Sequence, residues 1–428
     1  MLGQKLHTKL GDLWWYTILL FLAQRFGDVI NLFVGLWLVP KYVPQAELGA
    51  VMPLTQFVAF LGLPLSIVAI PFMKFLDVFA GRGELGKVKA LLRDVFAGSA
   101  VMVLVTLLLA WLVMPFVFDR MRVAVGSLGI LVILATILGA VSSIFQNAVQ
   151  GLKLFSSVVW FSVLGAPFRL LLMIVAMPFR ALSGYFVGQT ASPMVTIVGS
   201  MWVLRHHLGS SVKAVSYWKE DGRAILRYTW PIAINVLATV VFASLDQLII
   251  RLRLPEFESA GYYMVSWFAE ISNYLGSAFV VFLFPLVAGS SDKERDSRRV
   301  LVHSVLGTYL GGGGIAVLLL LGGRWLLGLT EAWRVYQALS FEMFLVAIYN
   351  VLAVANLCFM TYETALGRFR FLCYLVPLYA LKAGLLFVLT DYHLDFIFIV
   401  FIIVQLVLLP CLLFEVFGRR AGAPGKAE

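Results

Sequence analysis

Continuous apolar runs long enough to cross a lipid bilayer dominate this sequence. A helix needs about 20 predominantly apolar residues to span the hydrocarbon core. Candidate spans lie at about 13–39, 47–73, 95–118, 123–149, 156–178 and 182–204, and then at about 230–252, 260–288, 300–328, 333–360, 369–390 and 394–417. Spans of a membrane β-barrel would instead be short segments of alternating polarity. The sequence therefore predicts an all-α integral membrane protein with about twelve transmembrane helices.

Composition supports this prediction against a soluble fold. Hydrophobic residues make up 61% of the 428 residues and charged residues only 13%, whereas a soluble domain carries about a quarter charged residues. The surface must therefore face lipid. The three cysteines lie inside apolar runs and the five histidines form no ligand pattern, so we expect no disulfide framework, metal site or cofactor.

Lysine and arginine are concentrated in a few connecting segments. These segments are 74–93, 205–227, 293–299 and 419–428. With twelve spans they all lie on one side of the membrane together with both termini, and the positive-inside rule assigns that side to the cytoplasm. Their dispersal over short loops favours anionic lipid head groups as partners rather than nucleic acid. The polar segment 1–12 precedes a run long enough to span, so we expect the first helix to be retained as an anchor.

A polar stretch near the middle of the chain divides the spans into two groups of six. We therefore expect an N-terminal lobe (1–210), a cytoplasmic connector (211–229), a C-terminal lobe (230–418) and a cytoplasmic tail (419–428). The connector has the character of an amphipathic or loose segment. No segment outside the spans exceeds about 25 residues, too few for a nucleotide-binding or catalytic domain. The sequence thus predicts that the protein is not an enzyme.

The two halves share an internal repeat. Three residues recur in the same order with similar spacing, Asp28, Gly49 and Pro71 in the first half and Asp246, Gly261 and Pro285 in the second. An even number of spans per half makes the repeats parallel, related by an axis along the membrane normal. Two such lobes around a central cleft are typical of transporters that work by alternating access.

Ionisable residues at membrane depth are functional candidates because each is costly to bury in lipid. The first span carries Gln24, Asp28 and Asn31 on one helical face, and Arg25 is three residues from Asp28, close enough to pair with it. These residues either line a cavity or form a neutralised pair that holds helices together.

The seventh and eighth spans repeat this theme. In the seventh, Asp246 lies on a polar stripe, and Arg251 near the outer end either lines the cavity or extends to the interface. In the eighth, Glu270 and Asn273 belong to a continuous polar face, which predicts contact with a water-filled cleft.

Two further cations lie near mid-depth. Arg169 is in the fifth span and Lys382 in the eleventh. An isolated cation facing lipid is implausible, so each either finds a carboxylate on another helix or attracts an anion.

The segment 230–289 carries a family resemblance. It begins with Trp-Pro, continues with Asp-Gln-Leu-Ile-Ile at 246–250 and Ala-Gly-Tyr-Tyr at 260–263, and ends near Phe-Pro-Leu at 284–286. The first half echoes it with Asp28, Glu-Leu-Gly at 47–49 and Pro71. The chain resembles the multidrug/oligosaccharidyl-lipid/polysaccharide exporter superfamily, and within it the polysaccharide-export (Wzx-type) flippases of lipid-linked oligosaccharides.

The resemblance implies two six-helix lobes arranged as a V, with the first, second, seventh and eighth helices lining the cleft. It implies a flippase that moves a polyprenyl-diphosphate-linked oligosaccharide to the outer leaflet of the bacterial inner membrane, with ion coupling. The polymerase or glycosyltransferases of the same pathway are expected partners. The candidate substrate-binding residues are Arg25, Asn31, Arg169, Arg251, Asn273 and Lys382. The candidate ion-coupling residues are Asp28, Asp246 and Glu270.

Two other functions remain open from the sequence. One is a cation-coupled multidrug antiporter of the same fold, in which the first-span aspartate also occurs. The other is a membrane-embedded saccharide polymerase or ligase, which would need a large external loop. The chain lacks the two additional helices expected of a peptidoglycan-precursor flippase, and this departure disfavours that branch.

Overall fold

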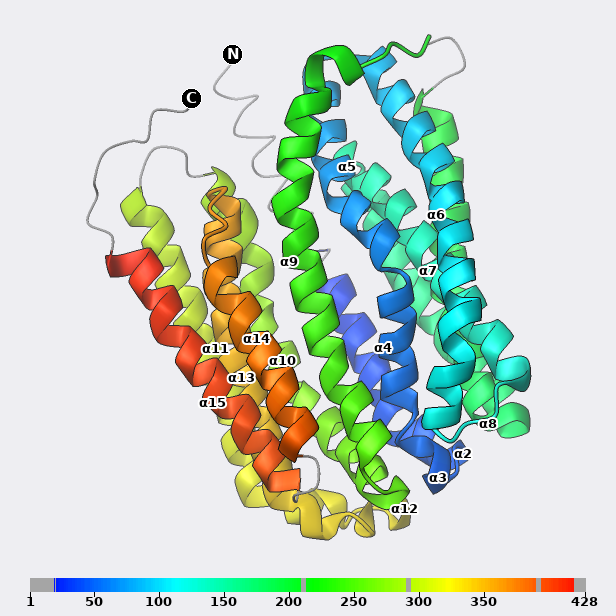
Figure 1. Cartoon of the computed structure of the whole chain (residues 1–428), viewed down its shortest axis with the longest axis vertical. Coiled ribbons are helices and arrows are strands. Elements are labelled where there is room, and N and C mark those ends of the chain that lie inside the picture. Colours follow the sequence, from blue (N-terminus) through cyan, green and yellow to red (C-terminus); the bar gives the residue numbers. More distant parts are fainter. Residues whose placement is uncertain (1–18, 20, 209–212, 290–293, 390–393, 419–428) are drawn as a thin grey trace. The chain divides into compact units, whose positions relative to one another are not determined.

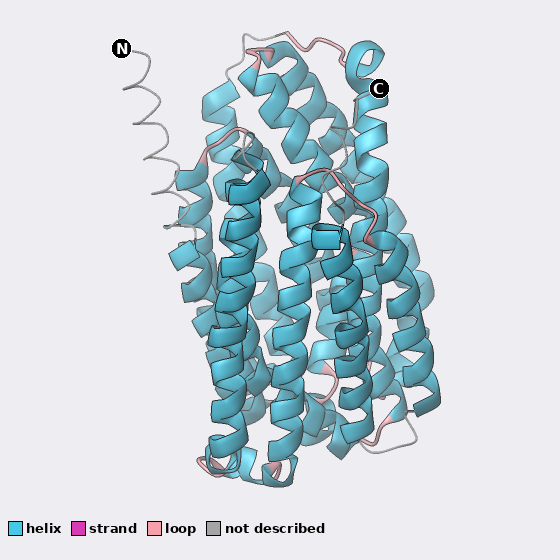
Figure 2. Cartoon of the chain, turned by 90° about the vertical axis from the view of Figure 1, so that its left-hand side faces the viewer, coloured by secondary structure: helices cyan, strands magenta, loops and turns pink. Residues whose placement is uncertain are grey.

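The computed structural model describes residue 19 and residues 21–208, 213–289, 294–389 and 394–418. Helices joined by short loops make up almost all of these residues, and none of them lies in a strand (Figure 2). The predicted all-α class is therefore confirmed. The polar segment 1–12 and the tail 419–428 fall outside the described residues.

The elements follow one another along the chain as Figure 1 labels them. The first helix, Phe21–Tyr42, ends in η1 (Val34–Leu38) and α2 (Val39–Tyr42), and is followed by α3 (Gln45–Leu48), α4 (Val51–Leu61), α5 (Leu63–Gly81), α6 (Leu85–Arg120), α7 (Gly126–Gly151), α8 (Phe155–Leu208) and α9 (Trp218–Arg253). The remaining elements are α10 (Glu256–Gly289), α11 (Glu294–Leu327), α12 (Glu331–Arg334), η2 (Gln337–Leu339), α13 (Ser340–Ala365), α14 (Leu372–Leu389), α15 (Leu394–Leu413) and η3 (Phe414–Gly418).

Every predicted span coincides with one or more of these helices. Within the described residues, nine helices are long and apolar enough to cross a membrane. Of these, α8 contains two of the predicted spans, and α10 and α14 account for the two spans that remain. The second predicted span, 47–73, comprises α4 and the first part of α5, which meet at Gly62. The chain is a multi-pass membrane protein.

The long helix α8 is a hairpin of two antiparallel arms, 155–180 and 182–208. Ala181 between them has a non-helical backbone with φ 40° and ψ −115°. A Cβ on Gly184 would lie 2.6 Å from the Met177 backbone, and one on Gly165 would lie 2.6 Å from Ser192 Oγ. Small residues allow membrane helices to approach this closely. The two arms match the predicted spans at 156–178 and 182–204.

The chain forms two compact units, Met1–Ala260 (unit 1) and Gly261–Glu428 (unit 2). The division lies within α10 rather than at the polar connector 211–229. The reason is that α9 packs against α4 and α5 and so belongs to unit 1. A polar stretch in the sequence shows where a connector lies. It does not show which helices pack together, because that depends on how their side-chain surfaces fit one another. The two six-helix lobes remain a prediction.

The hydrophobic core of unit 1 is built largely by α5, α6 and α7. Leu76, Phe79 and Val88 are almost completely buried in it, together with Ala148 from α7. In addition, α7 packs along α8, while in unit 2 α13 packs against α11 and α15, and α15 packs against α14.

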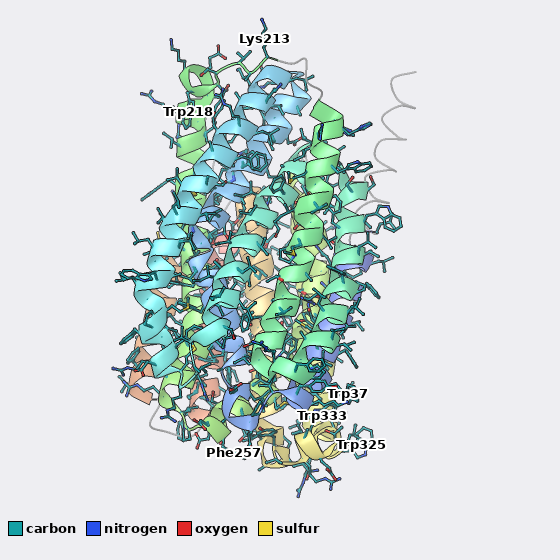
Figure 3. The ribbon with its side chains drawn as sticks, turned by 90° about the vertical axis from the view of Figure 1, so that its right-hand side faces the viewer. Trp37, Lys213, Trp218, Phe257, Trp325 and Trp333 are labelled. Carbon is teal, nitrogen blue, oxygen red and sulfur yellow. The ribbon has the colours of Figure 1, made fainter. Side chains whose placement is uncertain are left out.

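Exposed aromatic side chains mark the ends of the long helices. In unit 1, Trp37 and Phe257 lie at the end opposite Lys213 and Trp218 (Figure 3). Trp37 is 47% exposed, and the Lys41 ammonium lies 5.1 Å from its ring centroid. Tryptophan is enriched where a membrane meets water, so these positions indicate where unit 1 enters and leaves the bilayer.

The described end of the connector packs against the end of α5 and the start of α6. The Val215 amide donates to the Gly86 carbonyl at 3.0 Å, and the buried Tyr217 ring packs against Phe79. This contact places the basic α5–α6 turn and the connector at the same end of unit 1. The described part of the connector is thus an ordered segment that closes on the first half of the chain.

An ion-pair cluster holds this contact. The Lys87 ammonium lies 3.3 Å from Glu84, 2.6 Å from Glu220 and 2.9 Å from Asp221. Glu220 and Asp221 lie in the first turn of α9, where carboxylates also interact favourably with the helix dipole. The cluster therefore fixes the N-terminus of α9 to the first turn of α6.

We predict that Lys87→Gln exposes the connector to protease. Without the ammonium, Glu220 and Asp221 repel Glu84, and the backbone contact at Gly86 opens. Trypsin cleavage at the exposed Lys213 in inside-out vesicles should become several-fold faster. Lys153→Gln is the control because it removes the same charge from an exposed pair with Asp77, and exposed pairs contribute little. Equal cleavage in both variants would contradict the prediction.

We further predict that Gly49→Ala destabilises unit 1. Gly49 lies against α10, where the Ser259 hydroxyl donates to its carbonyl at 3.2 Å, and an added Cβ would lie 2.7 Å from the Ser259 carbonyl carbon. Overpacking of this kind costs about 1–3 kcal/mol, which should lower the melting temperature of the purified protein. Gly98→Ala in α6 meets nothing within 4 Å and should leave the melting temperature unchanged or slightly higher. A wild-type melting temperature for Gly49→Ala would refute the close contact.

Candidate functional site

The first helix carries an ion pair at membrane depth, as its sequence predicts. Arg25 and Asp28 are 3.0 Å apart, and their side chains are 23% and 22% exposed. The guanidinium also lies 5.2 Å from the centroid of the Phe21 ring. One turn of helix separates the two residues, so the pair forms without help from another element. Partial exposure leaves both groups accessible to a ligand.

The second predicted cation of unit 1 joins this helix from α8. A terminal nitrogen of the Arg169 guanidinium donates to the side-chain oxygen of Asn31. Arg169 lies about midway along the arm 155–180 and is partly exposed. The first helix and α8 approach nearby, where a Cβ on Gly27 would lie 4.0 Å from Ala166. The structure thus brings together Arg25, Asp28, Asn31 and Arg169, which we call the unit 1 polar cluster.

The other residues predicted in unit 1 lie on α9. Asp246 is buried, at 3% exposure. Along the same helix, the Thr239 hydroxyl donates to the Asn235 carbonyl at 2.8 Å. A threonine that bonds to its own helix backbone needs no other partner, so this hydroxyl is satisfied within α9.

Arg251 neither extends to the interface nor lines an open cavity. It is 4% exposed, and its guanidinium donates to the Ala46 carbonyl at 2.9 Å and to the Met121 carbonyl at 3.0 and 3.2 Å. The Ala46 carbonyl lies in α3, and the Met121 carbonyl lies at the end of α6. Arg251 therefore ties α3 and the end of α6 to α9.

The residues predicted in unit 2 occur as two separate groups. On α10, the Asn273 amide donates to Glu270 at 2.5 Å, and both side chains are partly exposed. The predicted polar face is partly satisfied within α10, since the Ser277 hydroxyl donates to the Tyr274 carbonyl. Ser266 on the same face is buried.

Lys382 is enclosed by aromatic rings. It is 1% exposed, and its ammonium lies 5.0 Å from the Tyr379 centroid, 5.1 Å from Phe401 and 5.8 Å from Tyr349. Cation–π attraction is strongest for desolvated cations, so this cage from α13, α14 and α15 stabilises a buried charge. Lys382 is held inside unit 2.

Sequence reasoning missed the polar side chains beside this cage. The Asn356 amide donates to the Gln405 side chain at 2.8 Å, and the Gln405 amide donates to the Tyr379 hydroxyl at 3.4 Å. Asn356 is 1% exposed and Gln405 is completely buried. Both residues are amides within apolar spans, and this position could have marked them as buried polar groups. They were missed because neither is charged or part of a polar stripe. Among the described residues, no group of three or more His, Cys, Asp or Glu side chains could hold a metal ion.

Comparison with known proteins defines the class to which this fold belongs. The structure superimposes on a multidrug resistance MATE family transporter of the MOP superfamily in its inward-facing conformation, with a TM-score of 0.70 and 13% identity over 92% of this chain and 95% of that one. It also matches the lipid II flippase MurJ in an inward closed conformation, with a TM-score of 0.68 and 13% identity over 93% of this chain and 87% of that one. At these identities the likeness shows the fold alone, which this chain shares with both proteins.

A comparison of the sequence with family profiles adds a second finding. Residues 80–290 match the profile of a family described as "Polysaccharide biosynthesis protein". Among curated proteins, none matches the chain significantly. Fold and family profile agree with the resemblance seen in the sequence, which is to the polysaccharide-export branch of the multidrug/oligosaccharidyl-lipid/polysaccharide exporter superfamily.

We predict that Arg251→Met lowers stability. The substitution preserves the long apolar stem and leaves the Ala46 and Met121 carbonyls without this donor, and the loss at the buried Met121 carbonyl costs about 1–3 kcal/mol. The melting temperature of the purified protein should fall by several degrees. Arg253→Met is the control because Arg253 lies only two residues further on and is exposed. A loss of transport at unchanged stability would assign Arg251 to the substrate instead.

Proposed function

We propose that the protein is a flippase that moves a polyprenyl-diphosphate-linked oligosaccharide from the cytoplasmic to the outer leaflet by alternating access. The family profile and the transporter fold support a transporter or flippase in polysaccharide biosynthesis. The observation that carries the finer proposal is the unit 1 polar cluster, which places two partly exposed guanidinium groups on neighbouring helices at membrane depth.

Arginine suits the diphosphate of such a substrate. The guanidinium group is always charged, is less strongly hydrated than an ammonium and offers paired donors to phosphate oxygens. In the unit 1 polar cluster, Arg25 is held by a carboxylate and Arg169 by the side chain of Asn31. A diphosphate would accept from both arginines, while the Asn31 amide would offer its remaining groups to the diphosphate or the first sugar.

Asp28 is the proposed coupling group of this cluster. In the structure its carboxylate neutralises Arg25 at 3.0 Å. Protonation of Asp28 would remove this competition and free the Arg25 guanidinium for the anionic substrate. Binding of a proton and of the substrate would then favour each other. We retain Asp246 and Glu270 as further coupling candidates, because both are carboxylates within spans.

Arg251 and Lys382 are left out of the proposed diphosphate site. The guanidinium of Arg251 donates to two backbone carbonyls, and the Lys382 ammonium is enclosed by three rings. Both are almost fully buried. We propose structural roles for them, and we keep Asn273, beside Glu270 on α10, as a contact for the saccharide.

We also propose the bacterial inner membrane as the location, with both termini in the cytoplasm. The ordered contact between the basic α5–α6 turn and the connector supports a single cytoplasmic end of unit 1. Anionic lipids and the polymerase or glycosyltransferases of the same pathway are the proposed partners.

The test is deletion of the gene followed by complementation. We predict that loss of the protein depletes surface polysaccharide and leaves lipid-linked intermediates in the cytoplasmic leaflet. Arg25→Ala and Arg169→Ala should fail to restore export, with transport rates at least tenfold lower, a loss of about 1.4 kcal/mol per factor of ten. Surface glycan and the sidedness of the intermediates are measured together.

The matched control is Arg180→Ala. Arg180 lies on the same arm of α8 as Arg169 and is exposed, so the variant removes an equal charge outside the unit 1 polar cluster. It should complement fully, and all variants must reach the membrane in equal amounts. Normal glycan combined with sensitivity to cationic drugs would refute the flippase and favour the multidrug antiporter.

A further inference from the structure

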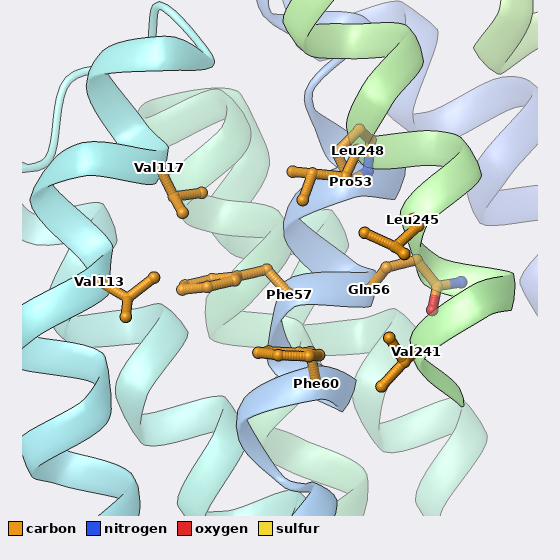
Figure 4. A pocket seen from close by; sticks show the side chains of 9 residues that line it. All are labelled: Pro53, Gln56, Phe57, Phe60, Val113, Val117, Val241, Leu245 and Leu248. Atoms are coloured by element: carbon orange, nitrogen blue, oxygen red, sulfur yellow. The ribbon is translucent and has the colours of Figure 1, made fainter. Parts of the chain in front are cut away.

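An apolar groove lies on unit 1, and no residue of the unit 1 polar cluster lines it. Its floor is one face of α4, and α6 and α9 form its two walls (Figure 4). The cavity volume is about 110 Å³, well above the roughly 10–15 Å³ of cavity that a single water molecule requires. The lining residues are Pro53, Gln56, Phe57, Phe60, Val113, Val117, Val241, Leu245 and Leu248.

Each helix contributes one stripe of side chains at helical spacing. The four floor residues of α4 follow positions i, i+3, i+4 and i+7, and the walls use i, i+4 on α6 and i, i+4, i+7 on α9. Residues at these spacings share one helical face. Phe57 points toward Val113 and Val117, while Gln56 points toward Leu245 (Figure 4). The groove is thus formed by side chains of three helices that pack together.

The groove is continuous with the lipid-facing surface. Phe60 on its floor is 42% exposed, and on the flanking helices Leu112 and Phe116 are 67% and 62% exposed, and Leu237 is 50% exposed. Water does not fill an apolar cavity of this kind, so hydrocarbon is the medium that occupies it.

The groove lies in the half of the membrane remote from the connector. Val113 is about 10 Å along α6 from its end at Arg120, and Val241 is about 18 Å along α9 from its end at Arg253, at 1.5 Å per residue. The hydrocarbon core is about 30 Å thick, so the groove lies largely in the leaflet remote from the connector. In the proposed topology this is the outer leaflet, to which the lipid carrier is delivered.

We infer that this groove binds the polyprenyl chain of the lipid-linked substrate. The inference rests on the proposed function and deepens it by assigning the lipid part of the substrate to a site. Phe57 and Phe60 present two rings along the floor, and branched side chains form both walls. Such a lining offers apolar contact to the methyl branches and double bonds of a prenyl chain.

The test places p-benzoylphenylalanine at Phe60 or, as the matched control, at Phe116. Both positions exchange one aromatic ring for a larger one, and Phe116 faces lipid on α6 outside the groove. The full-length protein is reconstituted in phospholipid vesicles with tritiated polyprenyl diphosphate and irradiated. Labelling from Phe60 should exceed labelling from Phe116 several-fold, and tritiated phosphatidylethanolamine should label both positions equally.

A second pair of variants fills the groove. In the protein with the photoreactive group at Phe60, Val241→Phe should reduce labelling by polyprenyl diphosphate several-fold. Leu237→Phe, one turn earlier on α9 and outside the groove, should not. Equal labelling at Phe60 and Phe116, preferential labelling by phospholipid at Phe60, or full labelling of Val241→Phe would each overturn the inference.

The outcome separates this inference from the proposed function. Transport of a lipid-linked saccharide is measured in the same vesicles with the wild-type protein. Transport without selective labelling at Phe60 would overturn the prenyl groove alone. Selective labelling without transport of any lipid-linked saccharide would support the groove and overturn the proposed flippase.

Discussion

The constraint on which the rest of this structure depends is the cost of placing a charge in hydrocarbon. Each buried ion must find a partner close by, and the partner determines which helices are held together. Arg25 meets this demand within its own helix through Asp28, whereas Arg169 meets it through Asn31 on another helix. The second contact joins α8 to the first helix in the middle of the membrane. The polar residues proposed to bind substrate are therefore also those that fix the local packing.

The degree of enclosure separates these cations by role. Arg25 and Arg169 keep part of their surface accessible, while Arg251 and Lys382 are almost completely covered. A substrate that binds a covered ion must first displace all of the groups that contact it. Such an ion is therefore poorly suited to bind a substrate. A partly exposed ion pair exchanges one partner for another at much lower cost. This difference, rather than charge alone, selects the residues suited to a substrate that binds and leaves in every cycle.

The sequence predicted what depends on local pattern. The spans and the hairpin of α8 follow from the lengths of apolar runs, and the Arg25–Asp28 pair follows from a spacing of three on a helix. The partners of Arg251 are backbone carbonyls, which carry no residue-specific signal. For Lys382, the sequence predicted a buried positive charge but not its three aromatic neighbours, because these rings come from three different helices. The sequence also could not assign α9 to unit 1, since that depends on its fit against α4 and α5.

The proposed substrate is an amphiphile, and unit 1 offers both kinds of surface that an amphiphile needs. The unit 1 polar cluster supplies hydrogen-bond donors for an anionic head, and the groove between α4, α6 and α9 supplies an apolar surface for a chain. A transporter of small soluble cations has no need for the second, and a protein that only holds a lipid has no need for the first. A flippase must stabilise the head during its passage through the membrane while the chain remains in contact with hydrocarbon. Two separate sites of opposite polarity on one compact unit meet that requirement, because each part of the substrate can stay solvated as the other moves.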